Sequence, residues 1–285
     1  MLPTEACSDE RNAYNLLSVV IARSISYNAG KGERHMNKAL YQAIFKRKSF
    51  HMFRGVGSEK LTEAELAEIR TAFNNFERLY PEIRTAIRII PAGQVNFKHD
   101  AEYCVMLYSE KKDNWLMNAG YIGEQLDLWL TVREIGSLWF GIGKPDEPGY
   151  DGLDYAIMIA IRKVKDASLF RKDMFKAKRK EISEIWSGDT FGLAEIARFA
   201  PSACNSQPWY VEQSGNRLTV YRRKKPAISF MNAAAAAYFN RIDMGIFLCF
   251  LELCMAEKNV AFTRELFVDD GDGKTELSKV AVYTV

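Results

Sequence analysis

Two long apolar segments, Tyr121–Ile135 and Asn240–Glu257, constrain the fold of this 285-residue chain more than any other sequence feature. Gly136 is expected to end the first one, because glycine readily adopts the left-handed conformation of a helix cap. The second segment is similarly apolar, so we expect one long buried helix in each half of the chain. The buried face of the first helix is predicted to contain Ile122, Leu126, Trp129 and Leu130.

The two segments also look like parts of a degenerate repeat. Gly123 and Gly245 are 122 positions apart (245 − 123), and a helix, a turn and a strand follow in both halves. Two buried helices agree this well by chance fairly often, so the repeat is a hypothesis. The apolar pairs at this offset are Leu126 with Leu248, Leu128 with Phe250, Leu138 with Val260, and Phe140 with Phe262.

The remaining predicted elements are shorter. Thr62 and Glu65 form a capping-box pattern that opens a helix through about Leu79. Ser214-Gly215-Asn216 predicts the turn of a hairpin. The other expected helices are Asn37–Lys48 and Phe191–Phe199, and the expected strands are Tyr103–Tyr108, Tyr155–Ile161, Trp209–Gln213, Leu218–Arg222 and Lys279–Val285.

Residues 1–35 read poorly as structure, because they mix polar residues with one short apolar patch. Lys31-Gly32-Glu33 can be encoded by AAA-GGA-GAA, which contains a purine-rich bacterial ribosome-binding sequence before the codon of Met36. One hypothesis is that translation starts at Met36, with residues 1–35 a mis-called or disordered leader. The other is a genuine N-terminal extension that is helical around Tyr14–Ile25.

Composition argues against several function classes. Lys plus Arg total 39 and Asp plus Glu total 36, a balance too even to imply nucleic acid or an anionic membrane as partner. The five cysteines form no Cys-x-x-Cys pair and the three histidines lack metal-ligand spacing. We therefore expect free thiols, a reducing cytoplasmic compartment and no metal site. The most apolar run, Met244–Leu251, is far shorter than the about 20 residues that a membrane-spanning helix needs.

A polar loop between a helix and a strand is the most informative stretch of the chain. Residues 199–211 read Phe-Ala-Pro-Ser-Ala-Cys-Asn-Ser-Gln-Pro-Trp-Tyr-Val, and the helix is expected to stop at Pro201. Ser202, Asn205 and Gln207 then present short polar groups and free backbone amides, which suit a ligand with many hydrogen-bonding edges and a phosphate. From composition alone, an ordinary polar turn before a strand is an equally good interpretation.

The pattern Pro-Ser-x-x-Asn-x-Gln-Pro-Trp over residues 201–209 resembles the signature of the FMN-dependent nitroreductase superfamily. Three weaker pieces occur in an arrangement typical of that family. Arg-Lys-Ser-Phe-His-Met-Phe at 47–53 is similar to its opening Arg-Arg-Ser-x-Arg-x-Phe motif. Gly-Ser-Leu-Trp-Phe-Gly at 136–141 is similar to a family turn, and Arg-Lys-Glu-Ile-Ser-Glu-Ile at 179–185 to the stretch after the last core strand. The resemblance covers roughly residues 36–285.

In ordinary members of that family, one subunit supplies the Arg-Ser motif and its partner supplies the Pro-Ser-Asn loop, with the flavin at the interface. Here the first motif occurs only in the first half and the second only in the second half. The resemblance therefore implies two nitroreductase-like halves, 36–165 and 166–285, fused into an internal pseudo-dimer with one FMN. The implied fold is α+β, with mixed, mainly antiparallel sheets flanked by helices, and the implied state is a monomer or a homodimer.

In the first half, the resemblance implies that Arg47, Lys48, Ser49 and His51 bind the cofactor. Arg47 should pair with the FMN phosphate, because a guanidinium presents a planar fork to phosphate oxygens. Ser49 can donate to a phosphate or ribityl oxygen. His51 stands where the family usually has Arg or Lys near the pyrimidine edge of the flavin, and Arg54 could substitute for it. The alternative for His51 is an exposed surface histidine.

The turn after the first long helix is also implied in the site. Leu138, Phe140 and Gly141 should pass close to flavin N5, with a backbone N–H of Phe140 or Gly141 as donor. A simple helix-to-strand turn is the alternative. Arg179 is a second candidate for the phosphate, and its alternative is a solvated charge in the run Lys176–Lys180.

The loop residues implied at the cofactor are Pro201, Ser202, Ala203, Asn205 and Gln207. Gln207 could instead hold the loop in shape, and Trp209 is expected in the core rather than at the cofactor. Cys204 has no activating base nearby in the sequence, so we expect a structural or bystander role for it.

The resemblance implies an FMN-dependent NAD(P)H oxidoreductase that reduces nitroaromatic, quinone or flavin-type acceptors by ping-pong hydride transfer. Flavin N5, not a side chain, would carry the chemistry, and a small-molecule oxidant would be the partner. The sequence does not distinguish NADH from NADPH. The alternatives are another flavin reaction on the same fold (deiodination, azoline oxidation or flavin fragmentation), a flavin-binding protein with lost activity, and a binding module without flavin.

Overall fold

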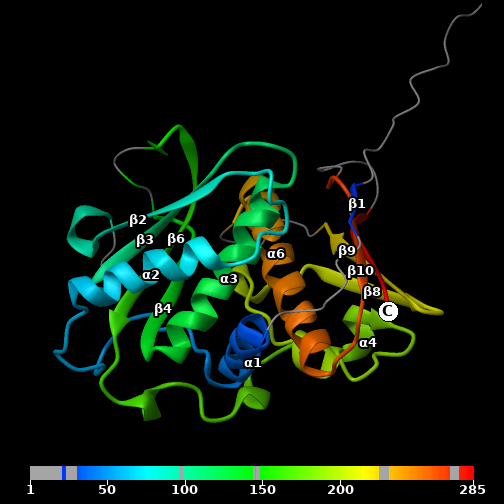
Figure 1. Cartoon of the computed structure of the whole chain (residues 1–285), viewed down its shortest axis with the longest axis horizontal. Coiled ribbons are helices and arrows are strands. Elements are labelled where there is room, and N and C mark those ends of the chain that lie inside the picture. The colour runs from blue at the N-terminus through cyan, green and yellow to red at the C-terminus, as the bar shows by residue number, and fades with distance from the viewer. Residues whose placement is uncertain are drawn as a thin grey trace, which may run out of the picture.

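The computed structural model describes residues 21–23, 31–96, 99–143, 145, 148–224, 231–269 and 276–285. Two sheets enclose a pair of long central helices, α3 (Trp115–Val132) and α6 (Ala233–Glu257), which lie side by side in the middle of the molecule (Figure 1). Strand pairing is antiparallel almost throughout. The α+β fold with mainly antiparallel sheets is therefore confirmed.

The first sheet contains four strands in the order β2-β3-β6-β4, with the two-residue β5 beside β6. Their bounds are β2 Thr85–Pro91, β3 Tyr103–Ser109, β4 Ile135–Phe140, β5 Gly149–Tyr150 and β6 Leu153–Lys163. Ile159 in the long strand β6 lies opposite Val105 of β3 on one side and Trp139 of β4 on the other. This register leaves β4 at an edge of the sheet, where its residues can line a site.

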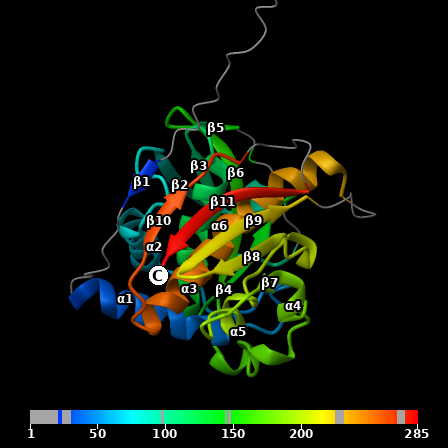
Figure 2. The same ribbon diagram turned by 90° about the vertical axis from the view of Figure 1, so that its right-hand side faces the viewer.

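The second sheet has the order β1-β10-β11-β9-β8-β7 and faces the viewer in Figure 2. Its strands are β1 Ile21–Arg23, β7 Trp186–Ser187, β8 Trp209–Ser214, β9 Arg217–Arg223, β10 Thr263–Leu266 and β11 Leu277–Thr284. The central four strands lie in the order β8-β9-β11-β10, which is the same arrangement, by order along the chain, as β2-β3-β6-β4 in the first sheet. In each half the chain makes two strands, then a long helix, then the other two strands.

The central helices approach each other closely through two glycines. A Cβ atom on Gly120 would collide with the carbonyl oxygen of Ile242, and one on Gly245 would collide with the carbonyl oxygen of Met117. The two contacts are equivalent, because each residue of one pair lies 125 positions from its counterpart in the other (245 − 120 and 242 − 117). Structural equivalence at this crossing therefore has an offset of 125, not the 122 expected from Gly123.

One hydrophobic cluster joins the two central helices to the inner faces of both sheets. Trp209 at the start of β8 is fully buried in it and stacks on Phe247 of α6, with ring centroids 4.8 Å apart. Trp209 is thus a core residue, as expected. Among the described residues, no helix has the length and apolar character needed to cross a membrane.

The shorter helices are α1 Lys31–Lys46, α2 Glu63–Asn75, α4 Ile182–Ile185 and α5 Ala194–Ala197, with 3-10 turns at Ala92–Gln94, Ala167–Leu169, Met174–Lys176 and Ala203–Asn205. The capping box at the start of α2 is present: the Thr62 side chain accepts from the Glu65 amide, and the Glu65 carboxylate accepts from the Thr62 amide. The hairpin around Gly215 is also confirmed, since β8 and β9 pair across it.

Several predicted bounds are wrong. The helix expected to end at Gly136 ends at Val132, and Gly136 lies in β4, where a side chain would meet Val164 and Phe50. Glu134, with φ 55°, makes the turn instead. The helix expected through Leu79 stops at Asn75, and only the middle of the helix expected over Phe191–Phe199 is helical.

The two N-terminal hypotheses concern residues that are partly outside the described ranges. Of the extension expected to be helical around Tyr14–Ile25, Ile21–Arg23 form strand β1, paired with β10, and the rest lies outside the described residues. Helix α1 begins at Lys31, so the expected start at Met36 falls inside a helix. The origin of residues 1–35 stays a prediction.

Candidate functional site

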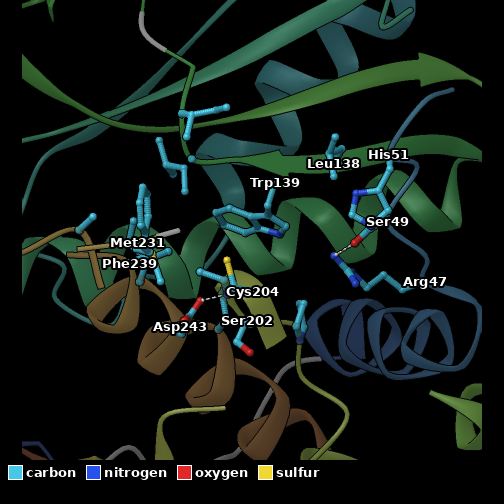
Figure 3. Close-up of a pocket in the computed structure, with 18 of the residues that line it drawn as sticks. Arg47, Ser49, His51, Leu138, Trp139, Ser202, Cys204, Met231, Phe239 and Asp243 are labelled. Atoms are coloured by element: carbon cyan, nitrogen blue, oxygen red, sulfur yellow. Dashed lines mark hydrogen bonds between the residues drawn. The ribbon is translucent and has the colours of Figure 1, made fainter. Parts of the chain in front are cut away.

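A cavity of about 410 Å³ lies where the end of α1, strand β4, the loop after α5 and the first half of α6 meet (Figure 3). Its size is within the range of small-molecule sites, about 300–1,000 Å³. The structure brings together these sequence-predicted residues on its walls: Arg47, Ser49, His51, Leu138, Gly141, Pro201, Ser202 and Ala203. The other lining residues are Trp139, Ile142, Ile157, Cys204, Met231, Asn232, Ala235, Phe239, Ile242, Asp243 and Ile246.

The two ends of the cavity differ in character. Arg47, Ser49 and His51 gather at one end, and Met231 and Phe239 stand at the other (Figure 3). The indole of Trp139 lies between them. The cavity can therefore receive a ligand with a polar or anionic end and a flat apolar body.

The segment after α1 is held against β4 by its backbone. The amide of Phe50 donates to the carbonyl of Ser137 at 3.0 Å, and Ser49 and Ser137 form an isolated parallel bridge. This pairing places Ser49 beside the strand that also supplies Leu138. Residues 89 positions apart in sequence (138 − 49) thereby form one wall.

Lys48 points away from the cavity. Its Nζ donates to the carbonyl of Leu169 at 2.9 Å and lies over the ring of Phe50. Phe140 is likewise absent from the lining and packs edge-on against His99, with centroids 5.9 Å apart.

Arg47 is almost completely buried, and Asp127 of α3 is its main partner. Its Nε donates to Oδ2 of Asp127 at 2.7 Å, and its Nη2 donates to Oγ of Ser49 at 3.3 Å. Asp127 also accepts hydrogen bonds from Nε1 of Trp139 at 3.0 Å and from Oγ of Ser137. Asp127 thus fixes three residues of this wall. Sequence reasoning missed it, although a lone aspartate in so apolar a helix is a signal of such a role.

A second carboxyl group lies beside this pair. Glu124 is one helical turn before Asp127, with Oε1 3.9 Å from Nε of Arg47. Burial and the charge of Asp127 raise the pKa of Glu124 well above its ordinary value, because both disfavour the ionised form. Neither carboxyl oxygen of Glu124 has a hydrogen-bond donor. The surroundings of Glu124 therefore favour its neutral form, and Asp127 is the closer counter-charge for Arg47.

The loop after α5 forms the opposite wall, and Gln207 holds it in shape. The Gln207 side chain accepts from the amide of Lys180 at 2.8 Å and donates to the carbonyl of Asn205 at 3.2 Å. Its backbone amide donates to Oγ of Ser202 at 3.0 Å. Gln207 is buried and outside the cavity lining. This position agrees with the alternative expectation that Gln207 holds the loop in shape.

Arg179 lies behind this loop rather than in the cavity wall. Its Nη1 donates to Oδ1 of Asn205 at 3.1 Å and its Nη2 to the carbonyl of Phe199 at 3.0 Å. Its buried Nε has no hydrogen-bond partner. Burial, followed by the charges of Arg47, Arg171 and Arg198, lowers the pKa of Arg179 to about 10.

Arg179 therefore lies in the repulsive field of neighbouring arginines, although Arg47 itself is paired with Asp127. Like charges held close together in a partly buried place repel one another, and an anion among them would relieve that repulsion. Arg171 reinforces the group: its Nε donates to the carbonyl of Arg47, and burial together with the charge of Arg47 lowers its pKa. The arrangement suits a phosphate group next to the polar end of the cavity.

Cys204 lies in the cavity wall and is exposed. Burial and the charge of Asp243 raise the pKa of its thiol, so the thiolate is disfavoured. A raised pKa does not suit a nucleophile. Asp243 and Phe239 on α6, and Met231 just before it, were missed by sequence reasoning, because they belong to no motif. Trp139 was also missed, although it lies inside the motif at 136–141.

Comparison with known proteins agrees with the fold. The model of the family described as "Putative TM nitroreductase" matches residues 39–255. The crystal structure of a putative nitroreductase from Thermotoga maritima is similar over 86% of this chain and 93% of that one, with a TM-score of 0.55 and 19% identity. A nitroreductase family protein from Clostridium difficile aligns with 53% of this chain and 98% of its own, with a TM-score of 0.40 and 15% identity. No curated protein sequence matches significantly.

Proposed function

Because the chain belongs to the "Putative TM nitroreductase" family, we propose that it is an FMN-dependent NAD(P)H oxidoreductase with one flavin site per chain. Family membership supports the oxidoreductase class. The identities of the cofactor as FMN, of the electron donor as NAD(P)H and of the acceptor class are what we propose in addition. Its acceptors are small nitroaromatic, quinone or flavin-type molecules.

The observation that carries the proposal is the meeting of two sequence motifs at one cavity. Arg47 and Ser49 come from the Arg-Ser motif, and Pro201 and Ser202 come from the Pro-Ser-Asn loop. These motifs are about 150 residues apart in the chain. Chance would not be expected to place both on opposite walls of one cavity of ligand size.

The residues present fit FMN. Arg47 and Ser49 lie at the polar end of the cavity, and the positive charge of Arg179 behind the loop adds to the attraction of that end for a dianionic phosphate. The apolar end with Met231 and Phe239 suits a flat aromatic ring system. Arg47 is expected to contribute through its Nη atoms, because its Nε is already bound to Asp127.

When bound, FMN would accept hydride from NAD(P)H at N5 and pass it to the acceptor in a ping-pong cycle. The chain itself would bind and orient. Arg47 and Ser49 would hold the phosphate and ribityl end, Arg179 would add positive charge from behind the loop, and His51 would face the pyrimidine edge. Leu138 and Gly141 of the β4 wall would approach the ring, and Pro201, Ser202 and Ala203 would face it from the loop. Asn205 was also expected there, but it is outside the cavity lining and its side chain binds Arg179.

We also propose that the chain is an internal pseudo-dimer with halves at residues 36–165 and 166–285. The same strand order in both sheets and the reciprocal glycine contacts of α3 and α6 support it. The site would then lie between the halves, each supplying one wall. An assembly of one chain or of two is compatible with this arrangement, and sedimentation would distinguish them.

Steady-state oxidation of NADH and of NADPH by the FMN-loaded protein, with menadione, nitrofurazone or riboflavin as acceptor, tests the activity. We expect acceptor-dependent oxidation with parallel-line ping-pong kinetics. Protein without FMN is the matched control and should be inactive. A protein that binds FMN but oxidises neither nucleotide would instead be a flavin-binding protein of this fold with a different or lost activity.

A further inference from the structure

The cavity loop contains a cluster of backbone conformations that most residues avoid. Cys204, Asn205 and Gln207 have φ values of 52°, 54° and 48°, in the left-handed region. Asparagine tolerates this region, but cysteine and glutamine rarely adopt it. Such conformations persist only where the surrounding structure fixes them. Contacts with neighbouring residues must therefore hold this loop in its conformation.

Asp243 of α6 makes two of the contacts that hold it. Its Oδ1 accepts from the backbone amide of Ala203 at 2.9 Å, and its Oδ2 accepts from Oγ of Ser206 at 3.2 Å. These two contacts lie on either side of Cys204 and Asn205. Asp243 is 3% exposed, so its carboxylate is shielded from water and its hydrogen bonds are charge-assisted. Figure 3 shows Asp243 and Cys204 close together under Trp139.

A related contact occurs in the first half of the chain. Asn118 of α3 lies 125 residues before Asp243 (243 − 118), which is the offset of the crossing glycines. Its Oδ1 accepts from the backbone amide of Tyr80 at 2.9 Å, in the loop before β2. Ala203 lies in the corresponding loop before β8. The first-half loop has no residue in the cavity lining and is held by a neutral amide, whereas the cavity loop is held by a carboxylate.

We propose that Asp243 is the positioning residue that holds the 201–207 loop in the shape that receives the flavin. That the loop receives a flavin rests on the proposed function, whereas the role of Asp243 in holding the loop does not. Asp243 acts through the backbone of Ala203 and the hydroxyl of Ser206, and these place Ser202 and the amides that follow it against the ligand.

The thiol of Cys204 provides a probe of the loop in protein without flavin. The other cysteines of the described residues are buried, and peptide mapping by mass spectrometry identifies Cys204 by position. We expect a thiol reagent such as N-ethylmaleimide to modify Cys204 about tenfold faster in Asp243→Ala than in Asp243→Asn, because hydrogen bonds to a buried anchor are lost. Asp243→Asn removes the same charge but keeps an acceptor for the Ala203 amide, so it controls for the effect of that charge on the thiol.

Flavin binding gives the second readout. We expect Asp243→Ala to weaken the binding of FMN and of riboflavin to a similar extent, by about tenfold, because the loop is proposed to contact the parts that the two flavins share. Asn118→Ala is the matched control, since it loses the equivalent contact away from the cavity. It should lower thermal stability and leave both flavin affinities and Cys204 reactivity unchanged. Ser206→Ala removes the second contact of Asp243 together with the 3.1 Å contact of the same hydroxyl with Oδ1 of Asn240. It serves if Asp243→Ala fails to fold and should show a smaller change in the same direction.

Equal Cys204 reactivity in Asp243→Ala and Asp243→Asn would overturn the proposal, as would an equal loss of flavin affinity in Asn118→Ala. Failure of the wild-type protein to bind any flavin would instead remove the proposed function. In that event the Cys204 rates still decide whether Asp243 holds the loop.

Discussion

Arg47 and Asp127 form a buried ion pair, with Nε of Arg47 2.7 Å from Oδ2 of Asp127, where the end of α1 meets the central helix α3. The pair determines how Arg47 can serve a ligand. Its Nε edge is bound within the protein, so only the Nη atoms remain for the cavity. Trp139 donates to the same carboxylate, so the ion pair also fixes the indole that lies across the cavity.

Loss of Asp127 should destabilise the fold strongly. Asp127→Ala leaves the Arg47 guanidinium buried without its counter-charge, and we expect the free energy of unfolding to fall by about 3–5 kcal/mol. Urea denaturation of the flavin-free protein measures this. Glu252→Ala is the matched comparison, because Glu252 lies on the other central helix, α6, 125 residues further on (252 − 127), and pairs with Arg264 of β10. Both variants should lose stability to a similar extent, and a loss below about 1 kcal/mol for Asp127→Ala would contradict the role given to the pair.

Glu124 should make stability depend on pH in a defined direction. Its folded-state pKa is raised above the ordinary value of 4.5, so its favourable contribution is present below that pH and is lost as the pH rises. Glu124→Gln imitates the neutral acid at every pH. We therefore expect the melting temperature of the variant to rise relative to wild type between pH 5 and pH 8.

Glu65 provides the opposite control, because its pKa is lowered by hydrogen bonds from Lys163 and the Thr62 amide. Its stabilising contribution is fully present above pH 5 and is lost as the pH falls below that value, so Glu65→Gln should differ from wild type by a constant amount from pH 5 to pH 8. A constant difference between Glu124→Gln and wild type from pH 5 to pH 8 would show that Glu124 is already ionised in the folded protein.

Arg179 should distinguish FMN from riboflavin. Arg179→Gln removes a charge from the arginine group proposed to hold the phosphate, so FMN affinity is expected to fall by about tenfold or more. Riboflavin lacks the phosphate and should bind equally to variant and wild type. Fluorescence titration with each flavin measures both affinities. Arg217→Gln, on the exposed turn of the β8–β9 hairpin, is the matched charge control and should change neither. Equal losses for both flavins would place Arg179 in a purely structural role.

Gly245 should be intolerant of any side chain. A Cβ atom there would collide with the backbone carbonyl of Met117, which cannot move without shifting α3. We expect Gly245→Ala to lower the free energy of unfolding by about 1–3 kcal/mol, as overpacking does in well-packed cores. Gly93→Ala is the control, because nothing lies within 4 Å of the added atom. Equal stability of the two variants would mean that the helices do not cross as closely as described.

Much of the fold follows from local sequence patterns. Thr62 with Glu65 fixes a helix start, Gly215 fixes a hairpin, and the long apolar segments contain the two central helices. The ends of helices were harder to predict, because a glycine such as Gly136 can either end a helix or make room for a neighbour in a strand. In β4 its missing side chain makes room for Phe50, and this depends on tertiary contact rather than on local propensity.

Only the cavity residues that belong to recognisable sequence motifs could be predicted. Arg47 and Ser202 belong to recognisable strings, and both line the cavity. Asp127 and Asp243 lie in long, mainly apolar helices, and each matters through a partner that is distant in sequence. Sequence spacing within one helix does not reveal such partners. The offset of 125 between the helices likewise emerges only from the contact of Gly120 with Ile242.

The absorbance spectrum of the protein after saturation with FMN and desalting shows whether the chain has a single flavin site. We expect a retained oxidised-flavin spectrum at about one FMN per chain, since the two motifs meet at one cavity. Bleaching on addition of NADH or NADPH should follow. If no flavin remains bound, or if two bind per chain, the single composite site is contradicted.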